Sequence, residues 1–319
     1  MRAVLIVNPN ATSTTAAGRD LLAHALESRV ELTVVHTDHR GHAVEIAQAA
    51  HREGIDVIIV HGGDGTVNEV VNGLLGPPGP DRPAADTLPA VAVVPGGAAN
   101  VFARALGISP DPIEATNQLV DLLDGYRRGG PWRRIGLMDC GERWAVFTAG
   151  MGVDGDVVAA VEAQRAKGRK VTAARYIRIA TREMLINARA EPLLTLHLPD
   201  REPVGGVHFA FVSKASPWTY ANSRPIFTNP GTTFEGGLGV FAVTSMNVIA
   251  NLLVVRRMWS KKAEIKGKNL IREDDLPWVR LTAAEPIACQ ADGDSLGART
   301  DMTFRSIPDA LVVVAPPPA

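Results

Sequence analysis

Short runs of apolar residues recur along the first 125 positions, and they alternate with segments in which apolar residues return every three or four positions. Continuous runs are typical of strands buried on both faces, and the longer period is typical of helices with one buried face. This alternation predicts a parallel sheet covered by helices on both faces. The predicted strands are 2–7, 31–36, 56–60 and 90–94, and the predicted helices are about 14–28, 42–53, the segment from Thr66 onward, and segments up to Asp124.

The pattern changes after residues 127–131, where short apolar segments are separated by Gly, Pro and Asn turns. This spacing is typical of antiparallel strands. We therefore expect two domains, an α/β domain at 1–130 and an antiparallel β-sandwich domain at 131–305. The predicted strands are 132–138, 143–148, 193–197, 207–213, 238–243, 278–282, 286–290 and 302–305, with one long helix over about 156–188.

Composition and charge narrow the functional classes. Of the 319 residues, 33 are Lys or Arg and 34 are Asp or Glu, and this balance argues against a dedicated nucleic-acid binder. Only Cys140 and Cys289 occur, so neither a disulfide framework nor a zinc site is indicated and a reducing cytoplasm is expected. The N-terminus lacks the form of a cleavable signal peptide, and the apolar stretch 240–255 is too short to span a bilayer.

The most informative segment, 61–74, reads HGGDGTVNEVVNGL and directly follows the apolar run 56–60. Its glycines allow the backbone to approach a polyphosphate closely, and the N-terminus of the following helix offers free N–H groups. Asp64 would repel phosphate unless a divalent metal or a reacting hydroxyl lies between them, so it is a candidate for catalysis and for metal binding. Thr66 is the predicted N-cap of the helix, with Glu69 as its capping-box partner. The glycines are Gly62, Gly63 and Gly65.

The whole segment resembles the nucleotide-binding signature of the diacylglycerol kinase catalytic-domain family, which includes bacterial lipid kinases and sphingosine kinases. The continuation NEVVNGL, residues 68–74, resembles the lipid-kinase branch, and residues 213–225 resemble a variant found in actinobacterial members. The resemblance extends from Asn8-Pro9 to Asp292-Gly293-Asp294. It implies a Rossmann-like first domain of the NAD kinase/diacylglycerol kinase type, completed by residues 306–319, with ATP and Mg²⁺ as cofactors.

Three further loops resemble segments that the family uses to bind the nucleotide. One contains Asn8-Pro9-Asn10, one contains Thr37, and one is the segment 95–100. The last departs from the family pattern, because Ala98 replaces a threonine and Val101 stands where relatives often have an aspartate. The nucleotide-binding candidates are therefore Asn8, Pro9, Asn10, Thr37, Gly62, Gly63, Asp64, Gly65, Thr66, Asn68, Glu69, Gly97 and Asn100.

The second domain supplies the remaining catalytic candidates. Asp292-Gly293-Asp294 resembles the family's Asp-Gly-Glu/Asp motif, in which the last carboxylate is the general-base candidate. Asp294 would thus accept the hydroxyl proton, and Asp292 would orient that hydroxyl or a metal ion. Glu235 stands where several relatives hold a magnesium ion through an aspartate, whereas Gly239 removes a second carboxylate there. Trp218 and Tyr220 either line an acyl pocket or pack in the β-rich core.

These features predict an ATP-dependent lipid kinase that converts diacylglycerol to phosphatidic acid at the inner face of the membrane. The expected partner is a lipid surface, with no nucleic acid, and a homodimer is left open. Two basic clusters, at 165–178 and 256–268 with Trp259, could contact anionic lipid, although solvated helix faces would look the same. The alternatives are an NAD kinase-like enzyme acting on a soluble nucleotide, and a catalytically silent regulator that binds lipid or nucleotide.

Overall fold

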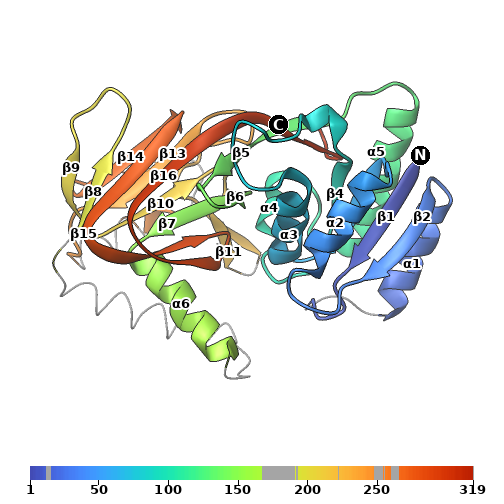
Figure 1. Ribbon diagram of the computed structural model, residues 1–319, viewed down its shortest axis with the longest axis horizontal. Helices are drawn as coiled ribbons and strands as arrows, with labels where there is room; N and C mark the ends of the chain where they lie inside the picture. Colours follow the sequence, from blue (N-terminus) through green and yellow to red (C-terminus); the bar gives the residue numbers. More distant parts are fainter. Residues whose placement is uncertain are drawn as a thin grey trace.

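Four parallel strands form one end of the molecule in the computed structural model (Figure 1). Their order is β4-β3-β1-β2, and β1, β3 and β4 are buried along almost their whole length. The continuous apolar runs of the sequence therefore do form strands covered on both faces. The strands are β1 (Arg2–Val7), β2 (Glu31–His36), β3 (Val57–Gly62) and β4 (Ala90–Pro95). The structure describes residues 1–11, 16–166, 191, 193–221, 223–247, 254, 256–259 and 266–318.

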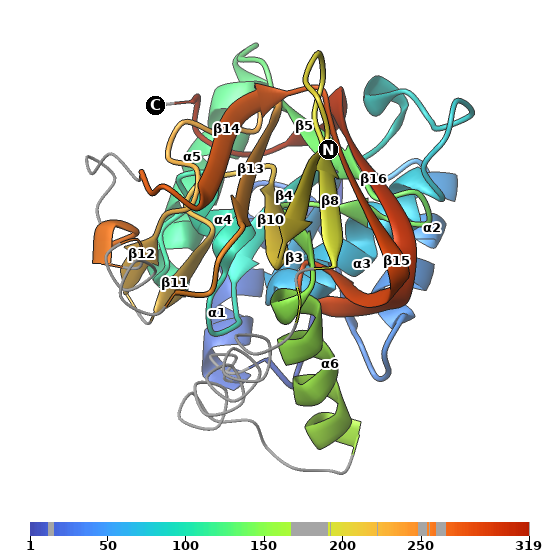
Figure 2. The same cartoon turned by 90° about the vertical axis from the view of Figure 1, so that its left-hand side faces the viewer.

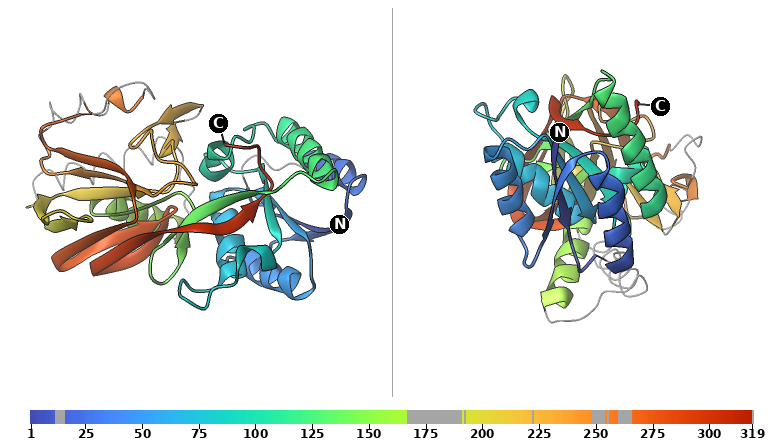
Figure 3. Two further views of the ribbon diagram at one scale, coloured as in Figure 1. Left: turned by 90° about the horizontal axis from the view of Figure 1, so that it is seen from above. Right: turned by 90° about the vertical axis from the view of Figure 1, so that its right-hand side faces the viewer.

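Helices cover both faces of this parallel sheet, as Figure 3 shows. α1 and α5 pack together on one face, and α2 and α3 pack together on the other. A Cβ at Gly73 of α3 would lie 2.7 Å from the carbonyl oxygen of Val44 in α2, so this glycine sets the close approach of the two helices. The helices are α1 (Ala16–Glu27), α2 (His42–Arg52), α3 (Asp64–Leu75), η1 (Ala85–Thr87), α4 (Val101–Ala105) and α5 (Pro112–Arg127).

The other end of the molecule is antiparallel and faces the viewer in Figure 2. Its sheet curls around a second apolar core, to which Leu196, Val212, Val240 and Phe304 contribute from different strands. The elements are β5 (Arg133–Asp139), β6 (Trp144–Ala145), β7 (Thr148–Met151), α6 (Val153–Ala166), β8 (Leu194–His197), β9 (Val204–Val207), β10 (Phe209–Ser213), β11 (Thr219–Ala221), β12 (Arg224–Ile226), β13 (Leu238–Val243), β14 (Leu270–Leu276) and β15 (Trp278–Ala291).

One long strand, β16 (Asp294–Val313), joins the two ends. It pairs with β15 in an antiparallel hairpin, continues alongside β5, and ends parallel to β4, where Val313 pairs with Val91. Within the described ranges, fourteen strands therefore belong to one mixed sheet, and β11 and β12 form a separate pair. Because β16 pairs with strands of both ends, it helps to fix their relative orientation.

Several predicted boundaries were wrong. The strands predicted at 278–282 and 286–290 are one strand, because β15 continues through a register shift between Thr282 and Ile287. The short strand predicted at 302–305 is part of β16, and the strand predicted at 143–148 is divided between β6 and β7. The helix predicted over 156–188 is described only as α6, because 167–190 lie outside the described residues. No helix in the described segments is long and apolar enough to cross a membrane.

Candidate functional site

The loops that follow the parallel strands meet at one edge of the sheet. The Asn8 side-chain amide donates to Thr66 Oγ1 at 3.0 Å, which ties the first loop to α3. The loops after β3 and β4 touch through glycines, because a Cβ at Gly97 would lie 2.6 Å from the Gly63 Cα. Thr37 is buried at the end of β2, and its N–H donates to the Val7 carbonyl. Four of the predicted nucleotide residues, Asn8, Thr66, Gly63 and Gly97, are thus brought together at the carboxyl ends of the parallel strands, whereas the nucleotide role of the set stays a prediction.

The start of α3 differs from the sequence prediction. Gly63 is the N-cap and α3 begins at Asp64, so the assignment of Thr66 as N-cap was wrong. The extended backbone of Gly63, with φ −94° and ψ −179°, leads directly from β3 into the helix three residues earlier than a threonine cap would. Glu69 makes no capping box, because its Oε1 accepts the Gly41 N–H at 3.0 Å and so ties α3 to the loop before α2.

Asp64 holds the loop after β4 in place. Its Oδ2 accepts the N–H of Val101 and its Oδ1 accepts the N–H of Phe102, each at 3.0 Å, so the carboxylate binds the first turn of α4. Burial raises the pKa of Asp64, and the hydrogen bonds from the α4 backbone oppose that shift. Asn100 closes the same loop, since its side chain both accepts from Gly97 N–H and donates to the Gly97 carbonyl. These hydrogen bonds hold the loop without using the side chain of Ala98 or Val101.

Asp292 is the most heavily bonded carboxylate of the site. It is buried in the left-handed backbone region, with φ 50°. Its oxygens accept the N–H groups of Val146, Phe147 and Thr148 at 2.6, 3.1 and 3.0 Å, and the Asn68 side-chain amide at 2.7 Å. Burial raises the pKa of Asp292 to about 6, and these hydrogen bonds oppose the shift. Both oxygens of this buried carboxylate accept hydrogen bonds from the protein, so the side chain positions its neighbours.

Two asparagines of α3 connect the parallel and antiparallel ends. Asn68 donates to Asp292 and to the Trp144 carbonyl, and its Oδ1 accepts from Arg143. Asn72, one helical turn later, accepts the Trp144 N–H at 2.9 Å and donates to the Trp144 carbonyl at 3.1 Å. Their spacing of four residues places both amides on one face of the helix. The Asn-x-x-x-Asn pattern of the sequence is thus a junction with β6.

Asp294 lies where the two ends of the molecule meet. Its Oδ1 accepts from Arg40 Nη2 at 2.9 Å, and its Oδ2 lies 3.3 Å from Arg143 Nη1. Arg40 belongs to the loop after β2, whereas Arg143 immediately precedes β6. The predicted general base is therefore partly exposed and held by a cation from each side. Sequence reasoning missed Arg143, Asn72 and Trp144, and the Asn-x-x-x-Asn spacing was the one signal that could have revealed the junction.

Glu235 does not stand in a metal cage. Its carboxylate binds the Arg133 guanidinium, with Oε1 at 2.8 Å from Nη2. Nearby, the fully buried Lys214 ammonium donates to the Gly236 carbonyl at 2.5 Å and to Ser306 Oγ at 3.1 Å. Burial lowers the pKa of Lys214 to about 8, opposed by Glu235 and Asp275. A Cβ at Gly239 would lie 2.2 Å from Thr232 Oγ1, so a carboxylate does not fit there. The cations Arg133 and Lys214 beside Glu235 disfavour a magnesium ion at this place, and the metal role of Glu235 stays an untested prediction.

Tyr220 and Trp218 take different positions. Tyr220 lines a cavity of about 450 Å³ together with Phe234 and Glu235, and the Arg104 guanidinium lies 3.3 Å above its ring. Trp218 stacks on Phe211 with ring centroids 4.6 Å apart and packs against an apolar cluster. The structure therefore places Trp218 in the β-rich core and Tyr220 at a cavity wall.

Part of the sequence is similar to a known protein family. Residues 2–124 match the family described as diacylglycerol kinase catalytic domain. This region belongs to the diacylglycerol kinase catalytic-domain family. The chain is 33% identical over 134 residues, 42% of this chain and 39% of the relative, to a probable lipid kinase YegS-like of Chromohalobacter salexigens. It is also 39% identical over 120 residues, 35% of each chain, to a diacylglycerol kinase of Bacillus subtilis.

The whole fold resembles solved structures of the same family. A putative diacylglycerol kinase from Bacillus anthracis superposes with a TM-score of 0.74 at 20% identity, over 99% of this chain and 97% of that one. A second diacylglycerol kinase structure from the same organism gives a TM-score of 0.69 at 18% identity, over the same shares of the two chains. The chain spans little more than a third of the length of these curated relatives.

We predict that Asn68→Asp destabilises the protein strongly at pH 7 and less at pH 5. The new carboxylate would face Asp292 in a buried setting, and an unpaired buried charge costs about 3–5 kcal/mol. Below neutral pH the pair can retain one proton and recover a hydrogen bond. Urea denaturation at both pH values measures the effect, with the exposed Asn10→Asp as control. Equal stability of the two variants at pH 7 would contradict the assigned junction.

We also predict opposite outcomes for alanine at two glycines. Gly97→Ala should lower the free energy of unfolding by about 1–3 kcal/mol, because its methyl group would collide with the Gly63 backbone. Gly65→Ala should leave stability unchanged or raise it by about 0.5–1 kcal/mol, because that position is exposed with no atom within 4 Å. Denaturation curves of both variants distinguish the cases, and a stable Gly97→Ala would show that the two loops do not pack as described.

Proposed function

We propose that this protein is an ATP-dependent lipid kinase that transfers the γ-phosphate to the hydroxyl of diacylglycerol. The observation that carries the proposal is the contact between Asp294 and Arg40. Asp294 comes from the motif expected to activate the acceptor, and Arg40 comes from one of the loops expected to bind the nucleotide. Phosphoryl transfer requires donor and acceptor groups to be held side by side, and this contact supports such an arrangement.

The chain's own residues divide the work of this reaction. Backbone N–H groups near Gly63 and Gly97 would hold the phosphates at the start of α3, where the helix terminus favours negative charge. Asp64 would act by fixing the α4 turn beside them. Asp294 would accept the proton of the lipid hydroxyl while Arg143 keeps its carboxylate oriented. A magnesium ion bound to ATP would neutralise phosphate charge. Such an ion would be held by the phosphates and would not need a cluster of protein carboxylates.

A catalytically silent nucleotide or lipid binder is the second candidate. It is favoured by the loss of two family groups at Ala98 and Gly239, and by the engagement of Asp64 with backbone N–H groups. Purified protein incubated with γ-labelled ATP and Mg²⁺ tests both candidates. Diacylglycerol, sphingosine and monoacylglycerol in mixed micelles, with NAD in a parallel reaction, are the acceptors. Label in phosphatidic acid supports the proposal, label in phosphorylated NAD favours a soluble nucleotide kinase, and bound ATP without transfer favours the silent binder.

We predict that Asp294→Asn slows phosphoryl transfer by about 10²–10⁴-fold with little change in ATP affinity, because a general base contributes about this much. Asp301→Asn is the matched control, since Asp301 lies on the same strand and also pairs with an arginine, Arg280. Single-turnover rates and equilibrium ATP binding separate the two effects. Normal turnover of Asp294→Asn would remove Asp294 from the reaction.

We further propose that the enzyme visits the membrane through residues near Trp259. Trp259 is 44% exposed, next to the buried Met258, and Arg256, Lys266 and Lys268 are exposed nearby in the sequence. Aromatic and basic side chains together suit an anionic lipid surface. Lys261 and Lys262, and most of the basic cluster at 165–178, lie outside the described residues.

Replacing Arg256 and Lys268 by Gln should weaken binding to anionic vesicles by roughly 30-fold, since each cation near such a surface is worth about 1 kcal/mol. The control is Arg127→Gln with Arg128→Gln, which removes the same charge at the exposed end of α5. Co-sedimentation with vesicles at low and high salt measures the binding. If both double variants pellet alike, the segment near Trp259 is only a solvated face.

A further inference from the structure

Three side chains with metal-ligating groups gather in the loop that also carries Thr37 and Arg40. Among the described residues, Asp38, His39 and His42 are the group of three or more carboxylate, imidazole or thiol side chains whose ligand atoms converge, all within 4.8 Å of one another. They lie in the loop between β2 and the start of α2. From these contacts we propose that Asp38, His39 and His42 form a binding site for a zinc-like divalent cation.

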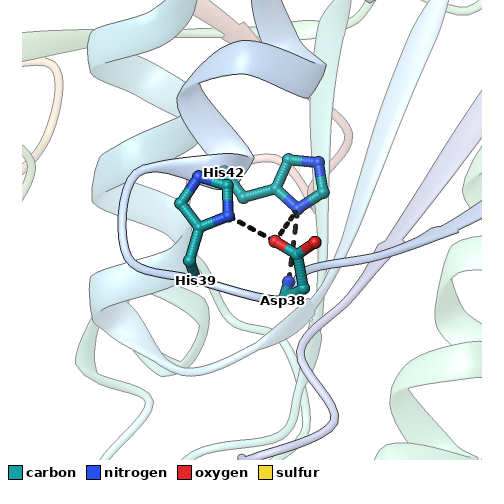
Figure 4. A group of neighbouring side chains, drawn as sticks. All are labelled: Asp38, His39 and His42. Atoms are coloured by element: carbon teal, nitrogen blue, oxygen red, sulfur yellow. Dashed lines mark hydrogen bonds and ion pairs between the residues drawn. The ribbon is translucent and has the colours of Figure 1, made fainter.

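The geometry of the three side chains supports this proposal. Asp38 Oδ1 lies 2.8 Å from His42 Nδ1, and the same oxygen contacts His39 Nδ1. The two rings are stacked, with centroids 4.9 Å apart and planes inclined by 7°. Figure 4 shows that both rings turn their Nδ1 atoms toward the Asp38 carboxylate. The three ligand atoms therefore lie close together, and the side chains of Asp38 and His39 are exposed.

The backbone around the cluster holds it in shape. Gly41 adopts φ 90°, which turns the chain back so that His42 lies over Asp38. The Asp38 N–H donates to His42 Nδ1 at 3.2 Å, and a bound ion would take the Nδ1 lone pair in place of this N–H. The Gly41 N–H is anchored to Glu69 Oε1 at 3.0 Å. Zinc lies about 2.0–2.1 Å from imidazole nitrogen, so an ion would require the donor atoms to separate slightly. The exposed side chains of Asp38 and His39 can make that adjustment.

A neighbouring carboxylate completes the arrangement. Glu45 Oε1 lies 3.6 Å from His39 Nε2, on the side of the ring away from the cluster. Imidazole ligands of metals commonly give their second N–H to a carboxylate, which orients the ring and fixes Nδ1 as the ligand atom. Glu45 is therefore placed to act as such a positioning residue.

The donor set selects the class of ion. Two imidazole nitrogens and one carboxylate oxygen suit zinc and related transition metals, whereas magnesium prefers oxygen ligands alone. The site is thus chemically distinct from any magnesium that accompanies ATP. The cysteine spacing of the sequence indicates no zinc site, whereas this cluster uses histidine and aspartate side chains. The two buried cysteines do not belong to this cluster.

Tag-free protein titrated with Zn²⁺ against a chromophoric chelator tests the site. We expect one equivalent of Zn²⁺ per chain, bound in the presence of millimolar Mg²⁺, and a weakening of more than about tenfold in both His39→Ala and His42→Ala. Asp38→Asn should also weaken binding. The control is His51→Ala, which changes a histidine at the opposite end of α2. The visible spectrum of bound Co²⁺ reports imidazole coordination directly.

The result that would overturn the proposal is equally direct. Absence of stoichiometric Zn²⁺ binding would do so, as would unchanged binding by the His39→Ala, His42→Ala double variant. Equal weakening in His51→Ala would show that the metal binds surface histidines without a defined site. Circular dichroism of each variant checks that it is folded, which matters most for His42 and His51 because both belong to α2.

Discussion

The buried carboxylate of Asp292 is the interaction on which the site depends. It takes three backbone N–H groups from residues 146–148 and one side-chain amide from α3, so a single charge ties the antiparallel end to the parallel end. Burial raises its pKa from 3.8 to about 6. The folded state therefore binds this proton more tightly than the unfolded state does. The resulting stabilisation of the folded state is fully present below pH 3.8 and is lost as the pH rises through 6. At neutral pH the ionised Asp292 carboxylate lowers the free energy of unfolding by roughly 3 kcal/mol. Without its four hydrogen-bond donors, burying this charge would cost more.

This junction also fixes where the neighbouring groups lie. Asp294 follows Asp292 after one glycine, so anchoring the first carboxylate sets the position of the second. Asn68 and Asn72 connect the same junction to the helix that begins at the phosphate-compatible glycines. The long strand β16 then carries the chain back to β4. Helix, junction and strand together hold the expected base near the loops of the parallel sheet, with Arg40 reaching across to it.

Much of the parallel end could be predicted from the sequence, because continuous apolar runs and strand-terminal glycines are local signals. Strands 2–7, 31–36 and 238–243 have the predicted bounds. The wrong assignments involved non-local geometry. Thr66 carries the sequence signature of a cap, but the hydrogen bond from Asn8 and the backbone of Gly63 place it inside the helix. β15 is one continuous strand because it stays paired with β16 on both sides of the register shift between Thr282 and Ile287.

The candidate site was predictable where a motif is contiguous, and less so where partners come from distant segments. Nothing in the sequence around Arg143 marks it as a partner of Asp294, because only the folded junction brings them together. Glu235 looked like a metal ligand from its place in a motif, yet Arg133, 102 residues away, pairs with it. The side chains of Asp38 and His42 come into contact because the chain turns back at Gly41.

A crystal structure with Mg²⁺ and a non-hydrolysable ATP analogue would test the central claim most directly. The account predicts the phosphates against Gly63 and Gly97, with the γ-phosphate facing Asp294 and the Asp292–Asn68 hydrogen bond intact. A nucleotide bound away from these glycines, or a γ-phosphate turned away from Asp294, would contradict it.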